Sequence, residues 1–171
     1  MTTSMHQAAI PTITRALTNL IGVLEKGAAH AEAKKIEPSV LINSRLYPDM
    51  FTLGKQVQVV SDIARGGISR LAQVESPKFE DNETTFPELV ERLRKTITYL
   101  ESLKPEQFEG ADARDIVLPL RDRKLEFKGL TYLTTFALPN FHFHVTTAYA
   151  ILRHNGVEIG KTDYLGGSRT E

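Results

Sequence analysis

The chain has 171 residues, of which 41% are hydrophobic and 25% are charged, a balance typical of one globular domain with a substantial core. Lysine plus arginine and aspartate plus glutamate both number 21, so the formal net charge is zero. The basic surplus that nucleic-acid binding normally requires is therefore missing. No cysteine is present, which excludes disulfides, thiolate nucleophiles and thiolate metal ligands.

The N-terminal residues 1–17 lack both the basic region and the continuous apolar region of a secretory signal. No segment approaches the roughly 18 apolar residues that a membrane-spanning helix needs. We therefore expect a cytoplasmic protein that has neither a membrane nor a nucleic acid as its partner.

Apolar residues recur at three- and four-residue steps in the first half of the chain and predict two long amphipathic helices. The first covers about Ser4–Lys35, and it either kinks or begins anew at Pro11. The second has Asp49 or Thr52 as its N-cap and ends near Leu71.

The third predicted helix has the clearest start signal, because Thr85 and Glu88 form a capping box; it extends to about Leu103. Its charged residues are expected to face solvent: Glu88, Glu91, Arg92, Arg94 and Lys95. Two short strands follow, Asp115–Leu120 and Lys124–Lys128. Because a lone hairpin is not independently stable, we expect it to lie over the helices.

A fourth helix is predicted over about Thr131–Asn155, with Gly156 in the C′ position that ends it. Four amphipathic helices, with a small hairpin between the third and the fourth, predict an all-α fold, a four-helix bundle. One domain accounts for residues 1–165, and we expect residues 166–171 to form a mobile tail.

Three of the five histidines fall in the fourth predicted helix. At about 100° and 1.5 Å per residue, His142 and His144 point to nearly opposite faces, and His154 lies about 15 Å beyond His144 along the axis. These histidines therefore cannot form one metal cluster. Asn140 and His144 share a face, at the spacing where two ligands or a relay pair can meet. The competing interpretation of His144 is a buried histidine hydrogen-bonded to another helix.

A second polar set lies on the second predicted helix, where Gln58 and Asp62 share a face and Gln56 lies on another. If the shared face turns inward, Asp62 can orient an imidazole or serve as a carboxylate ligand. Otherwise Asp62 points to solvent. The predicted pocket consists of Asn140, His144, Gln58 and Asp62.

Three stretches, Arg45–Phe51, Leu138–His144 and Ala150–Gly156, resemble an uncharacterised branch of the DinB/YfiT-like bundle superfamily. The resemblance extends to about Leu165 and implies a DinB-like four-helix bundle. Many of these proteins bind a divalent metal through three histidines, one on the second helix and an HxxxH pair on the fourth. They include thiol-dependent transferases and isomerases, and some form homodimers.

The resemblance places the second histidine of this pair at His144, which matches. It places the first at Asn140 and the ligand of the second helix near Val59, and neither residue is a histidine. A catalytic zinc site usually needs about three protein ligands. The resemblance therefore implies a degraded metal site, with His144 and Asn140 as the remaining candidate ligands.

These observations favour a small-molecule binding or interaction protein that has a polar pocket between helices around His144 and needs no cofactor. The alternative is a divalent-metal-dependent enzyme, hydrolase-like or thiol-transferase-like, in which His144, Asn140 and Asp62 hold Zn, Ni or Mn and activate a water. The expected partners are a small-molecule ligand and a second copy of the chain in a homodimer.

Overall fold

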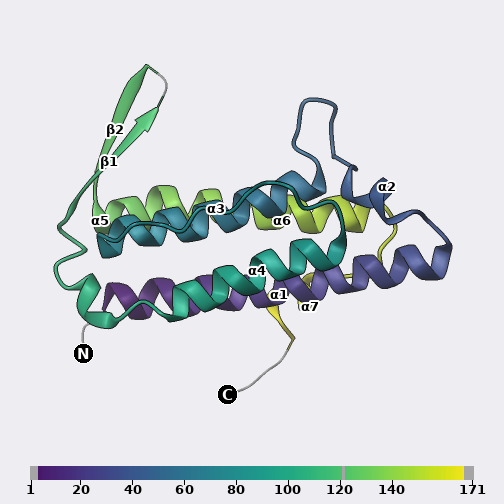
Figure 1. Cartoon of the computed structure of the whole chain (residues 1–171), viewed down its shortest axis with the longest axis horizontal. Helices are drawn as coiled ribbons and strands as arrows, with labels where there is room; N and C mark the ends of the chain where they lie inside the picture. Colours follow the sequence, from purple (N-terminus) through teal and green to yellow (C-terminus); the bar gives the residue numbers. More distant parts are fainter. Residues whose placement is uncertain (1–3, 121, 168–171) are drawn as a thin grey trace.

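The computed structural model describes residues 4–120 and 122–167 and confirms the predicted four-helix bundle. The long helices are α1 (Met5–Lys34), α3 (Leu53–Ala72), α4 (Phe86–Glu101) and α6 (Leu138–His154). Shorter helices are α2 (Pro38–Ile42), η1 (Pro105–Phe108) and α7 (Lys161–Leu165). Figure 1 shows α3 and α6 in one layer of the bundle and α1 and α4 in the other.

The predicted capping residues define the helix starts. Thr52, and not Asp49, caps α3 by accepting a hydrogen bond from the third backbone N–H of the helix. Thr85 and Glu88 form the predicted capping box at the start of α4. Pro11 lies inside α1, which is one helix from Met5 onward and does not begin anew at the proline.

The interior of the bundle is filled by apolar side chains from all four long helices, and their burial is the main favourable contribution to folding. The largest fully buried side chains include Leu17, Leu24, Leu53, Ile68, Leu71, Leu89, Leu93, Leu100 and Phe141. Within residues 4–120 and 122–167, no helix is both long enough and apolar enough to cross a membrane.

The fourth helix of the bundle is built from three consecutive segments. α5 (Gly129–Thr131) leads into η2 (Tyr132–Ala137), a π-helical segment, which leads into α6. Here α3 and η2 approach closely, because an added Cβ at Gly67 would lie 3.3 Å from the hydroxyl of Tyr132. Because Gly67 has no side chain, α3 and η2 can lie this close together.

Strands β1 (Asp115–Leu120) and β2 (Arg123–Lys128) form an antiparallel hairpin between α4 and α5, as predicted. The ring of Phe127 packs against Tyr132 and Phe136 of η2, with centroids 5.9 and 5.4 Å away. The hairpin is therefore anchored on the fourth helix at its base. Figure 1 shows the rest of it projecting away from the bundle near one end, so it does not lie over the helices as expected.

The chain after α6 returns to α1. Gly156 has a φ of 89° just past the end of α6, as the C′ prediction requires. α7 is held on α1 by Asn19, whose amide donates to the carbonyl of Tyr164 at 3.0 Å. Of the tail predicted to be mobile, only Gly166 and Gly167 belong to the described residues; the rest of 166–171 lies outside them.

Gly129, at the junction of the hairpin and the fourth helix, gives a test of this packing. An added Cβ there would overlap the backbone carbonyl of Ala111, whereas nothing lies within 4 Å of an added Cβ at Gly22 of α1. We expect Gly129→Ala to lower the free energy of unfolding by about 1–3 kcal/mol through overpacking. Gly22→Ala, the control, should raise it by up to about 1 kcal/mol through helix propensity. Chemical denaturation measures both, and a stabilised Gly129→Ala variant would contradict the described packing.

Candidate functional site

His144 lies on α6 where this helix packs against α3, and it forms a hydrogen bond across the contact. Its Nδ1 lies 2.6 Å from Oε1 of Gln56, a side chain that is only 1% exposed. The Nε2 of Gln56 donates to the backbone carbonyl of Phe51 at 3.4 Å, which assigns the accepting role to Oε1. The Nδ1 of His144 therefore carries the proton and donates it to Gln56.

This hydrogen bond leaves a lone pair on Nε2 of His144, because a neutral imidazole protonated at Nδ1 is an acceptor at its other nitrogen. Burial lowers the pKa of His144 below its usual value of 6.5, so the ring is neutral at pH 7. Because burial favours the neutral ring, His144 contributes its full share to the free energy of unfolding at pH values above its pKa in the unfolded state. This contribution is lost as the pH falls through its pKa in the folded state. The site therefore offers an uncharged hydrogen-bond acceptor under neutral conditions.

Aromatic rings flank the imidazole. Phe51, from the connection between α2 and α3, lies nearly parallel to His144, at an interplanar angle of 21° and a centroid separation of 6.4 Å. Phe143 meets it edge-on, at 88° and 5.1 Å. These two phenylalanines are 50% and 56% exposed, so apolar surface in contact with solvent borders the imidazole.

Asn140 lies one helical turn before His144 on α6, as the sequence spacing predicts. Its side chain is partly exposed. Among the residues that the structure describes, no hydrogen bond involves the amide of Asn140, which therefore provides a second polar group next to the imidazole.

Gln58 and Asp62 lie on a different side of α3, towards α4 and the α3–α4 connection (residues 73–85). Nε2 of Gln58 donates to Glu83 at 3.0 Å, and Oδ1 of Asp62 accepts from Arg92 at 2.7 Å. Figure 1 shows the connection running back along α3. The two side chains share a face, as predicted, but that face lies towards the connection and not towards α6, and the side chain of Asp62 is 43% exposed.

The structure therefore does not bring the four predicted pocket residues together. Asn140 and His144 belong to the α3–α6 contact, and Gln58 and Asp62 belong to an ion-pair cluster at α4. Over the described ranges 4–120 and 122–167, no hydrogen bond joins Gln58 or Asp62 to His144. The side chain that orients the imidazole is Gln56, which occupies the role considered for Asp62.

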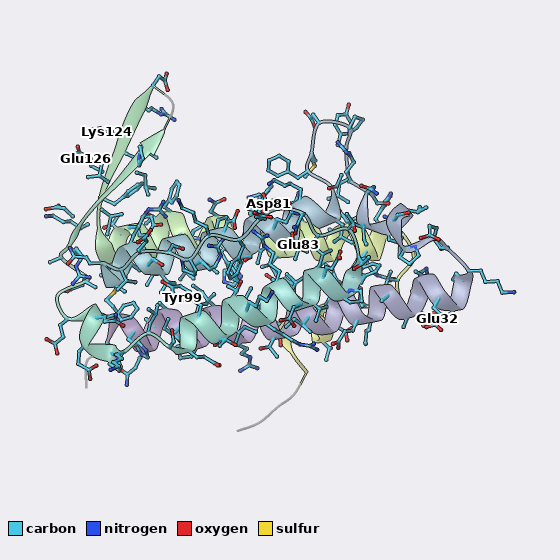
Figure 2. The ribbon with its side chains drawn as sticks, in the orientation of Figure 1. Glu32, Asp81, Glu83, Tyr99, Lys124 and Glu126 are labelled. Carbon is cyan, nitrogen blue, oxygen red and sulfur yellow. The ribbon has the colours of Figure 1, made fainter. Side chains whose placement is uncertain are left out.

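The prediction that the charged residues of the third helix face solvent is wrong for Arg92. It is 2% exposed, and its guanidinium forms ion pairs with the carboxylates of Asp62, Asp81 and Glu83 at 2.7–2.9 Å, donating hydrogen bonds to Asp62 and Glu83. Figure 2 shows Asp81 and Glu83 on the connection where it passes α3. Burial opposes the charge of Arg92, but hydrogen bonding and attraction from Glu83 and Asp62 outweigh it and raise its pKa.

Arg65 of α3 completes the cluster. It is also buried, and its guanidinium donates to Asp62 and to the carbonyl of Pro77. The guanidinium carbons of Arg65 and Arg92 lie 4.1 and 5.7 Å from the ring centroid of Phe79 in the connection. These contacts attach the connection to α3 and α4, and they occupy the acids that could otherwise act chemically.

Sequence reasoning missed Gln56 as a site residue, although a signal for it exists. Gln56 follows Leu53 by three residues and precedes Val60 by four, so it lies within the apolar stripe of α3. A glutamine in a buried stripe needs a partner. The opposite faces predicted for the histidines are confirmed, because Nδ1 of His142 lies 3.5 Å from the hydroxyl of Tyr164 on α7, away from Gln56.

The residues at His144 do not fit the metal site that the family resemblance implies. The α3 residue that faces His144 is Gln56 and not Val59, and its Oε1 already accepts the proton of Nδ1. Asn140 offers an amide oxygen, a weak zinc ligand. Within the described parts of the chain, no three His, Asp or Glu side chains are grouped so that they could hold a metal ion.

Two open surface hollows lie away from His144. One, of about 600 Å³, lies between the α3–α4 connection and α4; the other, of about 850 Å³, lies between α1 and α7. Neither is lined by His144 or Asn140. The polar groups at the α3–α6 contact therefore stand at a partly exposed surface and not in either hollow.

A double-mutant cycle tests the hydrogen bond between the two helices. Gln56→Leu and His144→Phe each leave a partner unpaired, so each should lower the free energy of unfolding by about 1–3 kcal/mol. The double variant leaves neither group unpaired and should cost less than the sum, with a coupling of about 1 kcal/mol.

The matched control combines Gln56→Leu with His142→Phe, on the opposite face of α6. The costs of these two substitutions should add, because the side chains share no partner. Chemical denaturation at neutral pH measures all the variants. Additive costs for Gln56 and His144 would show that the hydrogen bond contributes nothing.

Residues 5–165 match the model of a protein family described as a domain of unknown function, DUF1993. The comparison with curated proteins found no match. Among solved structures, the crystal structure of a DinB family member protein from Shewanella denitrificans is similar, with a TM-score of 0.90 and 41% sequence identity. The similarity covers 98% of this chain and 94% of that chain. The chain therefore belongs to the DUF1993 family, within the DinB-like helical bundles.

Proposed function

We propose that this protein binds a small, neutral molecule at His144, one that carries an N–H or O–H donor on an aromatic ring. The observation that carries the proposal is the 2.6 Å hydrogen bond between His144 and Gln56. It holds the imidazole in one orientation and one tautomer, with Nε2 as the acceptor. A fixed acceptor costs little further ordering when a ligand binds.

The surroundings of the acceptor support an aromatic ligand. Small-molecule sites combine apolar and aromatic surface with a few placed polar groups. Here Phe51 and Phe143 supply exposed ring surface beside His144, and the amide of Asn140 supplies a second polar contact. A planar ring that packs on the phenylalanines would bring its donor to the imidazole.

The electrostatics support a neutral ligand. Burial lowers the pKa of His144, so protonation of the ring to attract an anion is disfavoured. The buried guanidiniums of Arg65 and Arg92 are paired with carboxylates on the other side of α3. Neither of them is placed to recognise an anionic group at His144.

Phenol and toluene form a matched pair of probes, because they have similar size and only phenol carries a donor. We expect phenol to bind with a Kd in the millimolar range, about −4 kcal/mol. Toluene should bind about tenfold more weakly, the equivalent of one hydrogen bond. His144→Phe should reduce phenol binding to the level of toluene.

Two-dimensional NMR titration locates these effects, with the His144 ring and the Asn140 amide as reporters and His142 on the opposite face as the control. Equal shifts with phenol and toluene would contradict a role for the acceptor nitrogen. Shifts confined to residues far from His144 would place binding elsewhere.

The second candidate is a divalent-metal-dependent enzyme with His144 and Asn140 as ligands, without Asp62, which pairs with Arg65 and Arg92 on the other side of α3. One observation favours this candidate. A metal-ligating histidine usually donates its other ring N–H to a second residue, as His144 does to Gln56. This candidate predicts about one equivalent of Zn, Ni or Mn per chain in purified protein, lost in His144→Ala. If elemental analysis finds this metal, the result would contradict our proposal and support the metal-dependent enzyme.

A further inference from the structure

The hairpin leaves unpaired backbone groups on both of its outer edges, because the sheet of the described residues consists of β1 and β2 alone. An unpaired edge is a template for pairing with another strand. Figure 2 shows Lys124 and Glu126 of β2 on the side of the hairpin away from the bundle. Both residues are exposed, and no ion pair involves either of them in the structure described.

Pro119 determines which backbone groups point outward. It lies opposite Lys124 in the antiparallel register and has no N–H, so this pair is of the non-hydrogen-bonded kind. Hydrogen-bonded and non-hydrogen-bonded pairs alternate along the hairpin, so the backbone N–H and C=O groups of Lys124, Glu126 and Lys128 point to the outer edge of β2. On β1 the corresponding outer position is Pro119 itself, which cannot donate. Every outward-pointing residue on the free edge of β2 can therefore both donate and accept a backbone hydrogen bond, whereas the free edge of β1 lacks a donor at Pro119.

We propose that the free edge of β2 pairs with β2 of a second copy of this chain, antiparallel about Leu125. In this register Lys124 lies opposite Glu126 of the second copy, and the same contact occurs again by symmetry. Both residues have outward-pointing backbone groups, so they fall in hydrogen-bonded pairs, as an antiparallel ladder requires. The two charges attract each other at both contacts.

Neighbouring registers are less favourable, which makes the pairing specific. A symmetric pairing about Glu126 places Lys124 opposite Lys128 of the second copy and Glu126 opposite itself. A pairing about Lys124 places Asp122 opposite Glu126. Both arrangements set like charges against each other, which is destabilising. The charge pattern of β2 therefore complements itself in the register about Leu125.

The apolar face of the hairpin supports the same register. Leu125 lies opposite Leu118 within the hairpin, next to the pair formed by Ile116 and Phe127. Ile116 and Leu118 are buried on this face. In the dimer the two copies of Leu125 form a non-hydrogen-bonded pair, in which side chains approach most closely. The apolar face then continues across a four-stranded sheet.

One strand pair is a small contact compared with the roughly 1,200 Å² that stable interfaces bury. We therefore expect a weak dimer, with a Kd of about 10–500 μM, or roughly −7 to −4.5 kcal/mol. This inference does not depend on ligand binding at His144.

Sedimentation equilibrium of the full chain, up to about 1 mM, tests the pairing by charge exchange. Lys124→Glu and Glu126→Lys each place like charges opposite each other at both contacts, so each variant alone should dimerise at least tenfold more weakly than the wild type. A 1:1 mixture of the two restores opposite charges at both contacts and should associate as well as the wild type does. The double variant Lys124→Glu/Glu126→Lys should dimerise like the wild type for the same reason.

The matched control is Lys95→Glu on α4, which makes the same charge change at another exposed position; it should leave the dimer unchanged. Thermal unfolding of each variant shows that the bundle is intact. A monomeric wild type would overturn the proposal. So would single variants that dimerise like the wild type, or a mixture that fails to associate.

Discussion

Helix α3 is packed on two sides, so the polar side chains on both sides must find partners inside the protein. Gln56 meets His144 on the α6 side, and Ser61 meets Thr96 on the α4 side at 2.8 Å. Arg65 reaches the α3–α4 connection. Each of the neutral groups would cost about 1–3 kcal/mol if it were buried without a partner, and the charged guanidinium of Arg65 would cost more. The requirement fixes the rotation of α3 against both neighbours, and with it the placement of the imidazole.

The two sides of α3 have different consequences. On the α4 side, carboxylates and guanidiniums neutralise one another around Phe79, and every acid paired with Arg92 is engaged. Removing Arg92 would leave the carboxylate of Glu83, whose side chain is 11% exposed, without its cation, so this cluster preserves the fold. On the α6 side there is one neutral hydrogen bond, and exposed aromatic rings border the imidazole that forms it. The second side is the one at which we propose that a ligand binds.

The elements that depend on local signals were predictable from the sequence. The capping box of Thr85 and Glu88, the glycine after α6 and the two short strands depend on signals within a few residues, and the structure has all of them. The π-helical segment before α6 has no such local signal and was not predicted.

The site was predictable only in part, because helical periodicity assigns a side chain to a face but does not identify what covers that face. Asn140 and His144 share a face as predicted, and so do Gln58 and Asp62. The burial of Arg92 depends on where the connection crosses α3 and α4, which no spacing in α4 indicates. The pairing of Gln56 with His144 depends likewise on how α3 packs against α6.

The most direct test of this account is the protonation state of His144 in the folded protein. Long-range ¹H–¹⁵N correlation spectra distinguish the two neutral tautomers of an imidazole, and a pH series gives its pKa. We predict a proton on Nδ1, an unprotonated Nε2 and a pKa below 6.5. A proton on Nε2, or a pKa at or above 6.5, would contradict the claim that Gln56 holds His144 as a neutral acceptor.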